Sequence, residues 1–310
     1  MDLELEPYRG ELMVHCYQML GSVHDAEDLV QETMLRAWRA RSSYDAGRAS
    51  VRTWLHRIAT NACLTALEGR SRRPLPTGLG APSDQPEEAL VRGHEVTWLQ
   101  PLPDSRVGDP AAVVASRGRM RLAFVAAVQL LPPRQRAVLI LRDVLDFSAA
   151  EVASTLDTST AAVNSALQRA RASLGVPIDD TVAESLSDVD ARATVDRYVA
   201  AFEAADVRAL VDMLTHDAVL EMPPMLNWYV GREHYGRFIA RVFATRGTGW
   251  RMLPLAANGQ PGIGAYAPDE AGHGLHSVQF FEIGAAGVRR NTTFQDPDVF
   301  ALFDLAPRLP

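Results

Sequence analysis

The residue types best suited to chemistry lie near the middle of the chain, along one side of a predicted helix over residues 159–171. Amide, hydroxyl and guanidinium side chains repeat there at helical spacing, opposite an apolar side. Such an array can form hydrogen bonds with base edges in the major groove of DNA and ion pairs with phosphates. The polar residues on or beside this side are Asn164, Ser165, Gln168, Arg169 and Arg171.

Two preceding helices are predicted to position this one. Residues 132–133 are prolines, which suit the first turn of a helix because that turn does not use the missing N–H. Ser148 and Glu151 have the spacing of a capping box. Asp157 predicts a tight turn, after which Ser159 can cap the last helix. This pattern favours a helix-turn-helix that contacts DNA, and an ordinary three-helix bundle with a polar surface is the alternative.

A second basic segment precedes this region, with nine arginines against two acids between residues 36 and 73. Arginines and aromatic residues are interleaved there, which suits unpaired DNA because guanidinium groups contact phosphates and aromatic rings stack on bases. Trp54 in this segment is compatible with either DNA or the core.

Two helices are predicted before this segment, over residues 8–20 and from Asp25, as the N-cap, to residue 41. The second carries acids at its start and arginines at its end, as expected from the helix dipole. Its predicted inner side consists of Leu29, Val30, Met34, Leu35 and Trp38.

Composition and charge limit the possible classes of protein. A chain of 310 residues with 47% hydrophobic and 22% charged residues is globular and long enough for two or three domains. All 31 basic residues are arginine. Residues 117–171 contain eight arginines and four acids, whereas residues 180–310 contain 11 arginines and 17 acids. Two basic segments before an acidic one indicate two nucleic-acid surfaces and a C-terminal module that does not touch DNA.

Several other classes are not expected. No apolar run approaches the ~20 residues that cross a bilayer, and the acidic N-terminus does not resemble a secretory signal. The two cysteines, Cys16 and Cys63, lack metal-ligand spacing, so we expect no metal and no cofactor. We therefore predict a cytoplasmic protein that has no membrane partner.

Three stretches together resemble a known family. DAEDLVQETMLRAW, TWLHRIATNACLTALEGRSRR and LPPRQRAVLILRDVLDFSAAEVA occur in the order found in the extracytoplasmic-function (ECF) group of sigma-70-type RNA polymerase sigma factors. The resemblance covers roughly residues 8–75 and 117–175. It implies two all-α domains, sigma-2 over residues 1–75 and a sigma-4 helix-turn-helix over 117–178, joined by a linker over 76–116.

The resemblance implies three binding surfaces and two partners, promoter DNA and core RNA polymerase through its β′ clamp and β flap. The expected contacts with the β′ coiled coil are Asp25, Glu27, Asp28, Gln31 and Glu32. Those with the −10 element are Tyr44, Arg48, Ser50, Arg52, Thr53, Trp54, Arg57 and Asn61. Those with the −35 element are Ser159, Thr160, Ala161, Asn164, Ser165, Gln168, Arg169 and Arg171. Asn164 and Ala166 stand where the family often has a cation, which predicts weak −35 binding without polymerase.

The linker has many prolines and acids and no convincing long helix. In the family, the equivalent connector passes near the active-site and RNA-exit channels of polymerase. Residues 98–104 are unusually apolar for a linker, and we expect them to dock on another part of the protein, with the C-terminal domain as one candidate.

Residues 186–310 have helical patterns followed by four strand-like stretches, an α+β order. They resemble the SnoaL-like cone fold, which also contains ketosteroid isomerase. The polar candidates of this segment show no telling spacing, and Trp228 and Tyr229 fit a pocket or the core. These candidates are His216, Asp217, Glu221, His234, His276 and Glu282.

We therefore predict a non-enzymatic sigma factor whose C-terminal domain packs against the sigma domains and modulates activity in cis. The alternative is an isomerase- or cyclase-type enzyme fused to a helix-turn-helix regulator, because a fold does not determine a function.

Overall fold

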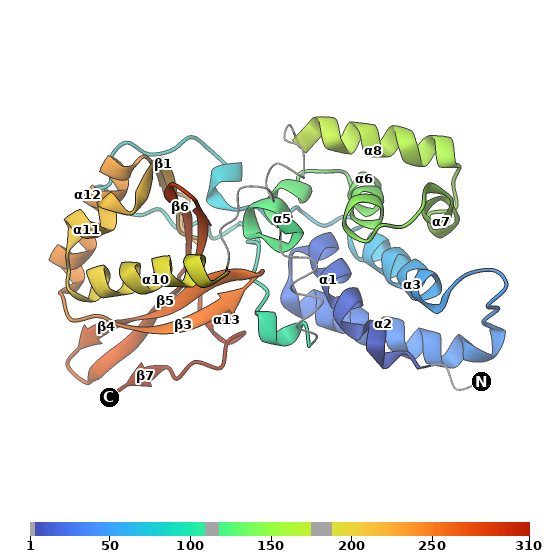
Figure 1. Ribbon diagram of the computed structural model, residues 1–310, viewed down its shortest axis with the longest axis horizontal. Helices are drawn as coiled ribbons and strands as arrows, with labels where there is room; N and C mark the ends of the chain where they lie inside the picture. Colours follow the sequence, from blue (N-terminus) through green and yellow to red (C-terminus); the bar gives the residue numbers. More distant parts are fainter. Residues whose placement is uncertain (1–3, 109–117, 175–187) are drawn as a thin grey trace. The chain divides into compact units, whose positions relative to one another are not determined.

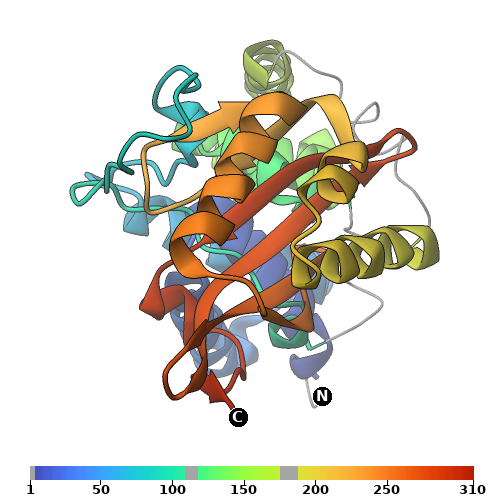
Figure 2. The same ribbon diagram turned by 90° about the vertical axis from the view of Figure 1, so that its left-hand side faces the viewer.

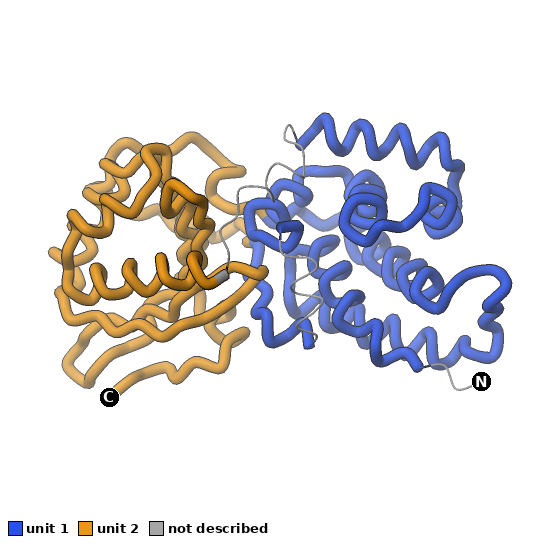
Figure 3. Tube along the Cα trace, viewed as in Figure 1, with its two compact units in different colours: residues 1–73, 99–181 blue, residues 74–98, 182–310 orange. Residues whose placement is uncertain are grey.

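The computed structural model describes residues 4–108, 118–174 and 188–310 (Figure 1). The chain forms two compact units (Figure 3). Unit 1 consists of Met1–Arg73 and Leu99–Thr181, and unit 2 consists of Pro74–Trp98 and Val182–Pro310. The chain therefore enters unit 2 twice, first with residues 74–98 and again with the C-terminal module.

Unit 1 is helical, as the sequence predicted. Its main helices are α1 (Arg9–Leu20), α2 (Val23–Ala40), α3 (Val51–Ala66), α5 (Leu122–Val128), α6 (Pro133–Leu139), α7 (Ala149–Thr155) and α8 (Thr160–Leu174), with a π-helical turn over Ile140–Val144. Helix α1 is buried around most of its circumference, since Leu12, Cys16 and Tyr17 have no exposed surface. The buried part of α1 includes the polar residues His15 and Gln18, and helices α2, α3 and α6 contact α1.

Helix α2 begins earlier than the sequence predicted. Its N-cap is Ser22, whose hydroxyl accepts a hydrogen bond from the Asp25 backbone N–H (3.3 Å), so Asp25 lies inside the helix. Gly21 ends α1 in the left-handed conformation (φ +67°) and donates its N–H to the Tyr17 carbonyl. The turn between the two helices is thus made by Gly21 and Ser22.

The buried side of α2 also differs from the prediction. Leu35 and Trp38 are 46% and 57% exposed, so the expectation that Trp38 is core is wrong. The side that faces the core is formed by smaller residues, Val23, Ala26, Val30, Thr33 and Ala37. Small side chains allow α2 to pack closely, which leaves the larger residues outside.

The predicted helix-turn-helix is confirmed in its local detail. Ser148 and Glu151 form the capping box that starts α7, and Asp157 has a left-handed backbone (φ 51°) in the turn. The Ser159 hydroxyl accepts a hydrogen bond from the Ala162 N–H (3.2 Å) at the start of α8. Helix α8 buries only its apolar side and exposes the other.

Unit 2 is an α+β domain, as predicted. Its strands are β1 (Leu214–Glu221), β2 (Trp228–Val230), β3 (Arg251–Ala257), β4 (Gln260–Asp269), β5 (Gly272–Gly284), β6 (Gly287–Phe294) and β7 (Arg308–Leu309). They form one sheet in the order β2-β1-β6-β5-β4-β3, with β7 beside β5. Strands β3 to β6 form an antiparallel meander, whereas β1 runs parallel to β6.

The core of unit 2 lies between this sheet and its helices (Figure 2). Its helices are α10 (Asp188–Glu203), α11 (Val207–Asp212), α12 (Arg232–Arg246) and α13 (Pro297–Phe300). Aromatic residues dominate the contact, with Tyr198 and Phe202 on α10, Phe238 and Phe243 on α12 and Phe281 on β5. These side chains bury large apolar areas.

The linker is divided between the two units. Residues 74–98, here called the linker strap, belong to unit 2 and contain only a short 3₁₀ turn, Pro76–Gly78. Leu99 and Leu102 are fully buried in unit 1, where the Tyr17 hydroxyl donates to the Gln100 carbonyl (2.7 Å). The apolar stretch over residues 98–104 is thus divided, since Trp98 belongs to unit 2 and residues 99–104 belong to unit 1.

Candidate functional site

The outer side of α2 combines acidic and apolar groups. Asp28, Gln31, Leu35 and Trp38 follow each other at intervals of three or four residues, and all four are exposed. The Arg41 guanidinium carbon lies 4.2 Å from the Trp38 ring centroid. An exposed aromatic residue beside polar groups is typical of the centre of a protein-protein interface.

The other predicted acids of α2 have partners inside unit 1. Asp25 accepts from Arg70 (3.1 Å) and Arg73 (3.0 Å), and Glu27 pairs with Arg106 (3.2 Å). Glu32 pairs with Arg36 at 2.6 Å, one turn further along the helix. Asp25 thus holds the segment that follows α3, and Glu27 holds part of the linker. Asp28 and Gln31 face outward.

The predicted −10 residues fall into two groups. Arg48, Ser50, Arg57 and Asn61 are exposed, and Tyr44 and Trp54 are half-buried with their ring centroids 5.1 Å apart. Ser50 also caps α3 by accepting from the Thr53 N–H (3.1 Å). This first group presents two cations, one amide and an aromatic pair on one side of α3 and its preceding loop.

Arg52 and Thr53 form the second group, and they face α7 and the turn before it. The Thr53 hydroxyl donates to Glu151 (2.9 Å), and Thr53 is only 7% exposed. Arg52 donates to the Leu145 carbonyl (2.7 Å) and lies 4.3 Å from the centroid of the Phe147 ring. Both side chains therefore contact the helix-turn-helix region, and Arg52 also forms an ion pair with Glu11 on α1.

The electrostatics of Glu151 fit this arrangement. Burial raises the pKa of this carboxyl, but hydrogen bonds from Ser148 and Thr53 outweigh that effect and hold the pKa below its usual value. Glu151 is thus ionised at neutral pH and accepts from both α7 and α3.

All eight predicted −35 residues are exposed on α8 or at its start. Arg171 makes two hydrogen bonds with Asp143, at 2.8 and 2.7 Å, so much of its charge is neutralised within the protein. Arg169 remains as a cation on this face, beside the amides of Asn164 and Gln168.

Sequence reasoning missed one buried cation that positions these elements. Arg136 on α6 is 3% exposed and donates to the backbone carbonyls of Met19, Gln129 (2.9 Å) and Leu131 (3.2 Å). Burial lowers its pKa to about 10, so it stays charged at neutral pH. Because Met19 lies in the last turn of α1, this guanidinium joins α6 to the negative end of that helix dipole. The available signal was an arginine directly before the apolar run from Ala137 to Leu141.

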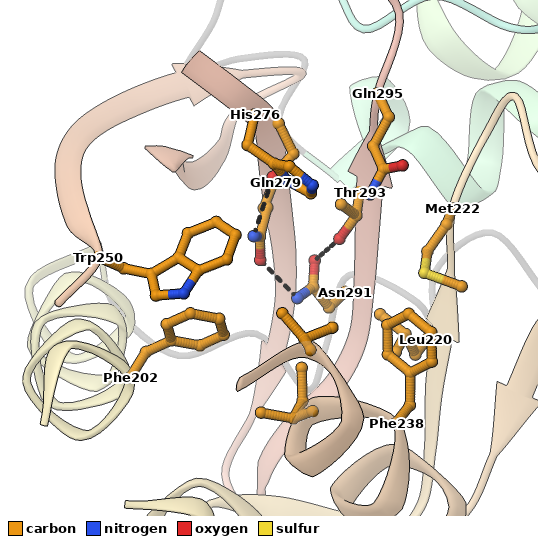
Figure 4. Close-up of a pocket in the computed structure, with 13 residues that line it drawn as sticks. Phe202, Leu220, Met222, Phe238, Trp250, His276, Gln279, Asn291, Thr293 and Gln295 are labelled. Atoms are coloured by element: carbon orange, nitrogen blue, oxygen red, sulfur yellow. Dashed lines mark hydrogen bonds between the residues drawn. The ribbon is translucent and has the colours of Figure 1, made fainter. Parts of the chain in front are cut away.

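The polar candidates of unit 2 are scattered. His216 and Asp217 lie together on the surface, with a Nδ1–Oδ1 distance of 3.6 Å. Glu221 is fully buried and accepts from Arg290 (2.8 Å), and Glu282 lies 3.8 Å from the same guanidinium. His234 contacts the Val230 carbonyl through Nδ1 (2.9 Å), and among the six candidates His276 alone lines the pocket of this domain (Figure 4). Tyr229 is core.

The linker strap is fastened to unit 2 by polar contacts along its length. The Thr77 hydroxyl donates to Glu221 (2.9 Å), and the Ser83 N–H donates to the Trp228 carbonyl (2.8 Å). Arg237 on α12 makes two hydrogen bonds with Glu87, at 2.9 and 2.7 Å. Further backbone hydrogen bonds join Val91 to Leu226 (2.8 Å) and Gly93 to Pro224 (2.9 Å).

Comparison with known proteins decides the family. Residues 5–73 match sigma-70 region 2, residues 121–174 match sigma-70 region 4, and residues 195–283 match the SnoaL-like domain. The chain is 50% identical to the ECF RNA polymerase sigma factor SigG of Mycobacterium tuberculosis over 98% of its own length and 83% of that protein. The chain is an ECF sigma factor.

Other relatives agree with this assignment. SigJ of Mycobacterium tuberculosis, another ECF sigma factor, is 30% identical over 98% of this chain and 90% of that protein. The crystal structure of SigJ matches 98% of this chain and all of its own, with a TM-score of 0.65 and 24% identity, and supports the same fold. The sigma factor thus carries both sigma-70 regions and a C-terminal SnoaL-like domain.

The described part of the sigma factor shows neither a metal-ligand cluster nor a helix suited to a membrane. No group of three or more His, Cys, Asp or Glu side chains there is arranged to hold a metal ion. None of the helices in the described ranges has the length and apolar character needed to cross a membrane.

Proposed function

We propose that this sigma factor binds core RNA polymerase through the exposed side of α2 and contacts promoter DNA through α3 and α8. Asp28, Gln31, Leu35 and Trp38 would contact the β′ clamp, and sigma-4 would contact the β flap. The first group of −10 residues would hold separated DNA, since it combines stacking faces with cations. The exposed side of α8 would lie in the major groove at the −35 element. Such a protein would act in the cytoplasm with polymerase.

Arg52 and Thr53 add a condition to this proposal. Thr53 is bound to Glu151 of α7, and Arg52 is bound both to the turn before α7 and to Glu11 of α1, so contact with the −10 element would require α3 to release these partners. The free protein would therefore bind promoter DNA weakly. Core polymerase would favour the separated form by binding the two helical domains at different places.

We further propose that the C-terminal domain modulates this activity in cis by holding the linker strap. The observation that carries the proposal is the series of contacts from Thr77 to Gly93, which fix residues between the two DNA-binding domains to the SnoaL-like domain. A connector held in this way cannot extend freely. The separation that the sigma-2 and sigma-4 domains can adopt would then depend on release of the linker strap.

A non-enzymatic role for the C-terminal domain is part of the proposal. An isomerase of the alternative type needs a base beside its substrate. The carboxylates of Asp217, Glu221 and Glu282 are absent from the described residues that line the pocket of this domain, and burial lowers the pKa of His276, which does line it, to about 4, so that this imidazole is a weak base. This distribution supports regulation in preference to catalysis.

In vitro transcription with core polymerase tests both parts of the proposal. Full-length protein and a chain ending at residue 180 should both direct promoter-specific transcripts, with different yields. If neither form does so, the sigma-factor role is wrong. Equal yields at every polymerase concentration would contradict modulation in cis.

A matched pair of variants separates the strap from the rest of the domain. Replacing both Arg237 and Arg241 with glutamine removes side-chain contacts with Glu87 and with the Pro86 carbonyl. We expect this variant to shift the yield toward that of the truncated chain. Arg251→Gln changes an exposed arginine on β3 and should leave the yield unchanged.

A further inference from the structure

Two histidines lie in the core of unit 1, where α1 and α3 meet the segment that leads into α7 (Figure 1). His15 on α1 and His56 on α3 have no exposed surface, and their ring centroids are 5.4 Å apart. Neither has a role in the binding surfaces proposed above. Because a histidine side chain ordinarily changes its charge near pH 6.5, a fully buried pair makes this core sensitive to acid.

The His56 ring is part of the contact between α3 and the helix-turn-helix region. Its centroid lies 5.1 Å from the centroid of the Phe147 ring, which belongs to the turn before α7. One turn earlier on α3, Arg52 and Thr53 are held by the same region. Separation of α3 from this region would therefore remove Phe147 from the imidazole and let water reach it.

Each imidazole has one nitrogen with a hydrogen-bond partner and one without among the described residues. His56 Nδ1 lies 2.9 Å from the Arg52 carbonyl and must donate to it, because a carbonyl oxygen only accepts. His15 Nε2 lies 2.9 Å from the Thr60 hydroxyl. The other two nitrogens, His56 Nε2 and His15 Nδ1, are buried without a partner. A proton added to His56 Nε2 would thus find no acceptor at hydrogen-bond distance in the described part of the chain.

The charged side chains around this contact come from the four segments that meet there. They are Glu11 on α1, Arg52 on α3, Arg142 in the π-helical turn and Glu151 on α7. The Glu11 carboxylate lies 3.8 Å from His56 Nε2 and pairs with Arg52. Arg142 donates to the carbonyl of the turn before α7, and Glu151 accepts from α3. All four are thus bound to groups other than the imidazole.

Burial determines the charge of both rings. It lowers the pKa of His56 below the ordinary 6.5, and the Glu11 carboxylate and the Arg52 carbonyl act in the opposite direction without cancelling it. The Arg52 guanidinium adds to the lowering. Burial lowers the pKa of His15 well below its ordinary value, and a charge on His56 would lower it again. Both imidazoles are therefore neutral at neutral pH while α3 and the helix-turn-helix region stay together.

We propose that His56 is a proton-sensitive switch that keeps α3 on the helix-turn-helix region at neutral pH and releases it in acid. In the closed form the neutral ring packs against Phe147. In the separated form water reaches the ring, a proton from the solvent binds to Nε2, and the imidazolium must lose that proton before the ring can be buried again. Acid therefore stabilises the separated form. This inference rests on the proposed function, since separation is the step that frees Arg52 and Thr53 for promoter DNA.

The size of the effect follows from the two proton affinities. The separated form has the ordinary pKa of 6.5, and the closed form has a lower one. Lowering the pH from 7.5 to 5.5 should therefore raise the ratio of separated to closed protein by up to about tenfold. The change begins near pH 6.5, above the range in which carboxylates ordinarily titrate.

Hydrogen exchange of the full-length protein measures this ratio without promoter or polymerase. Rates are divided by the intrinsic exchange rate at each pH, and peptides from residues 145–155 report the separation. In the wild-type protein these peptides should exchange about 3- to 10-fold faster at pH 5.5 than at pH 7.5, with the increase starting near pH 6.5. No increase, or one that starts only below pH 5, would refute the switch and leave the sigma-factor role untouched.

Two substitutions at one position and a matched control assign the effect to His56. His56→Asn keeps a donor for the Arg52 carbonyl, and His56→Phe keeps a ring beside Phe147, but neither side chain can bind a proton. In both variants the corrected rates should be the same at the two pH values. His24→Asn replaces an exposed histidine on α2 and should retain the wild-type response. A folded His56 variant that responds to acid as the wild type does would overturn the proposal.

Discussion

Thr77 offers a direct way to loosen the linker strap without touching either DNA-binding domain. Its hydroxyl donates to one carboxylate oxygen of Glu221 at 2.9 Å, and its backbone N–H lies 3.4 Å from the same oxygen. The other oxygen of Glu221 accepts from Arg290 and Thr292, at 2.8 and 3.1 Å. Thr77→Val keeps the shape of the side chain and leaves one oxygen of a fully buried carboxylate with only the long backbone contact.

The magnitude follows from the charge of the acceptor. A hydrogen bond to an ionised group contributes about 1.5–3 kcal/mol, and a buried acceptor left without its donor loses a similar amount. Thr77→Val should therefore favour local opening of the strap by about 10- to 150-fold, because each 1.4 kcal/mol corresponds to a factor of ten.

Hydrogen exchange measured by mass spectrometry reports this opening. Peptides from residues 74–98 should exchange about 10- to 150-fold faster in Thr77→Val, while peptides from β3 and β4 should not change. Thr77→Ser retains the hydroxyl and should stay close to wild type. Exchange within twofold of wild type in Thr77→Val would refute the reasoning. Equal acceleration in both variants would assign the effect to the lost methyl packing.

Three other predictions concern single side chains. Trp38→Ala should weaken binding of core polymerase by about tenfold, measured by fluorescence anisotropy, with the urea midpoint unchanged, because an exposed aromatic anchors interfaces and contributes little to folding. Arg169→Gln should reduce the slope of log K against log salt for promoter binding by the holoenzyme by about 0.9, and Arg171→Gln should reduce it less because Asp143 already pairs with Arg171. Lowering the pH from 7 to 5 should destabilise the C-terminal domain by about 2 kcal/mol through His276. The pKa of this side chain is 6.5 in the unfolded chain and about 4 in the folded domain. Between these values the unfolded chain binds the proton more tightly, so stability is lost as the pH falls. Urea unfolding at both pH values should show His276→Gln without that loss.

The local elements of the helix-turn-helix were predictable because their signals are themselves local. The Ser148–Glu151 capping box and the turn at Asp157 depend on residues within a few positions of each other. The strands of the C-terminal meander were likewise visible as separate apolar stretches. Family resemblance then placed the DNA-facing residues on these elements.

The predictions that failed concern side chains whose surroundings are set by tertiary packing. Trp38 and Leu35 continue an apolar stripe on α2, but the side that packs in the core carries Ala26 and Ala37. The sequence of the helix alone does not distinguish these two sides. The partners of Arg52 and Thr53 in the helix-turn-helix region lie more than 90 residues away in sequence. Spacing along one helix cannot show that two neighbours on a predicted DNA surface are held by a second domain.

The path of the chain has a consequence for how this protein can be dissected. Because residues 74–98 complete the C-terminal unit from a place more than 80 residues earlier, that unit is a discontinuous domain. A fragment that begins near residue 182 would lack Thr77, one of the donors to Glu221, and Glu87, the partner of Arg237. A synthetic peptide of residues 74–98 should restore stability to such a fragment when added in trans. Fragments meant to isolate the SnoaL-like domain should therefore be made with residues 74–98 supplied as well.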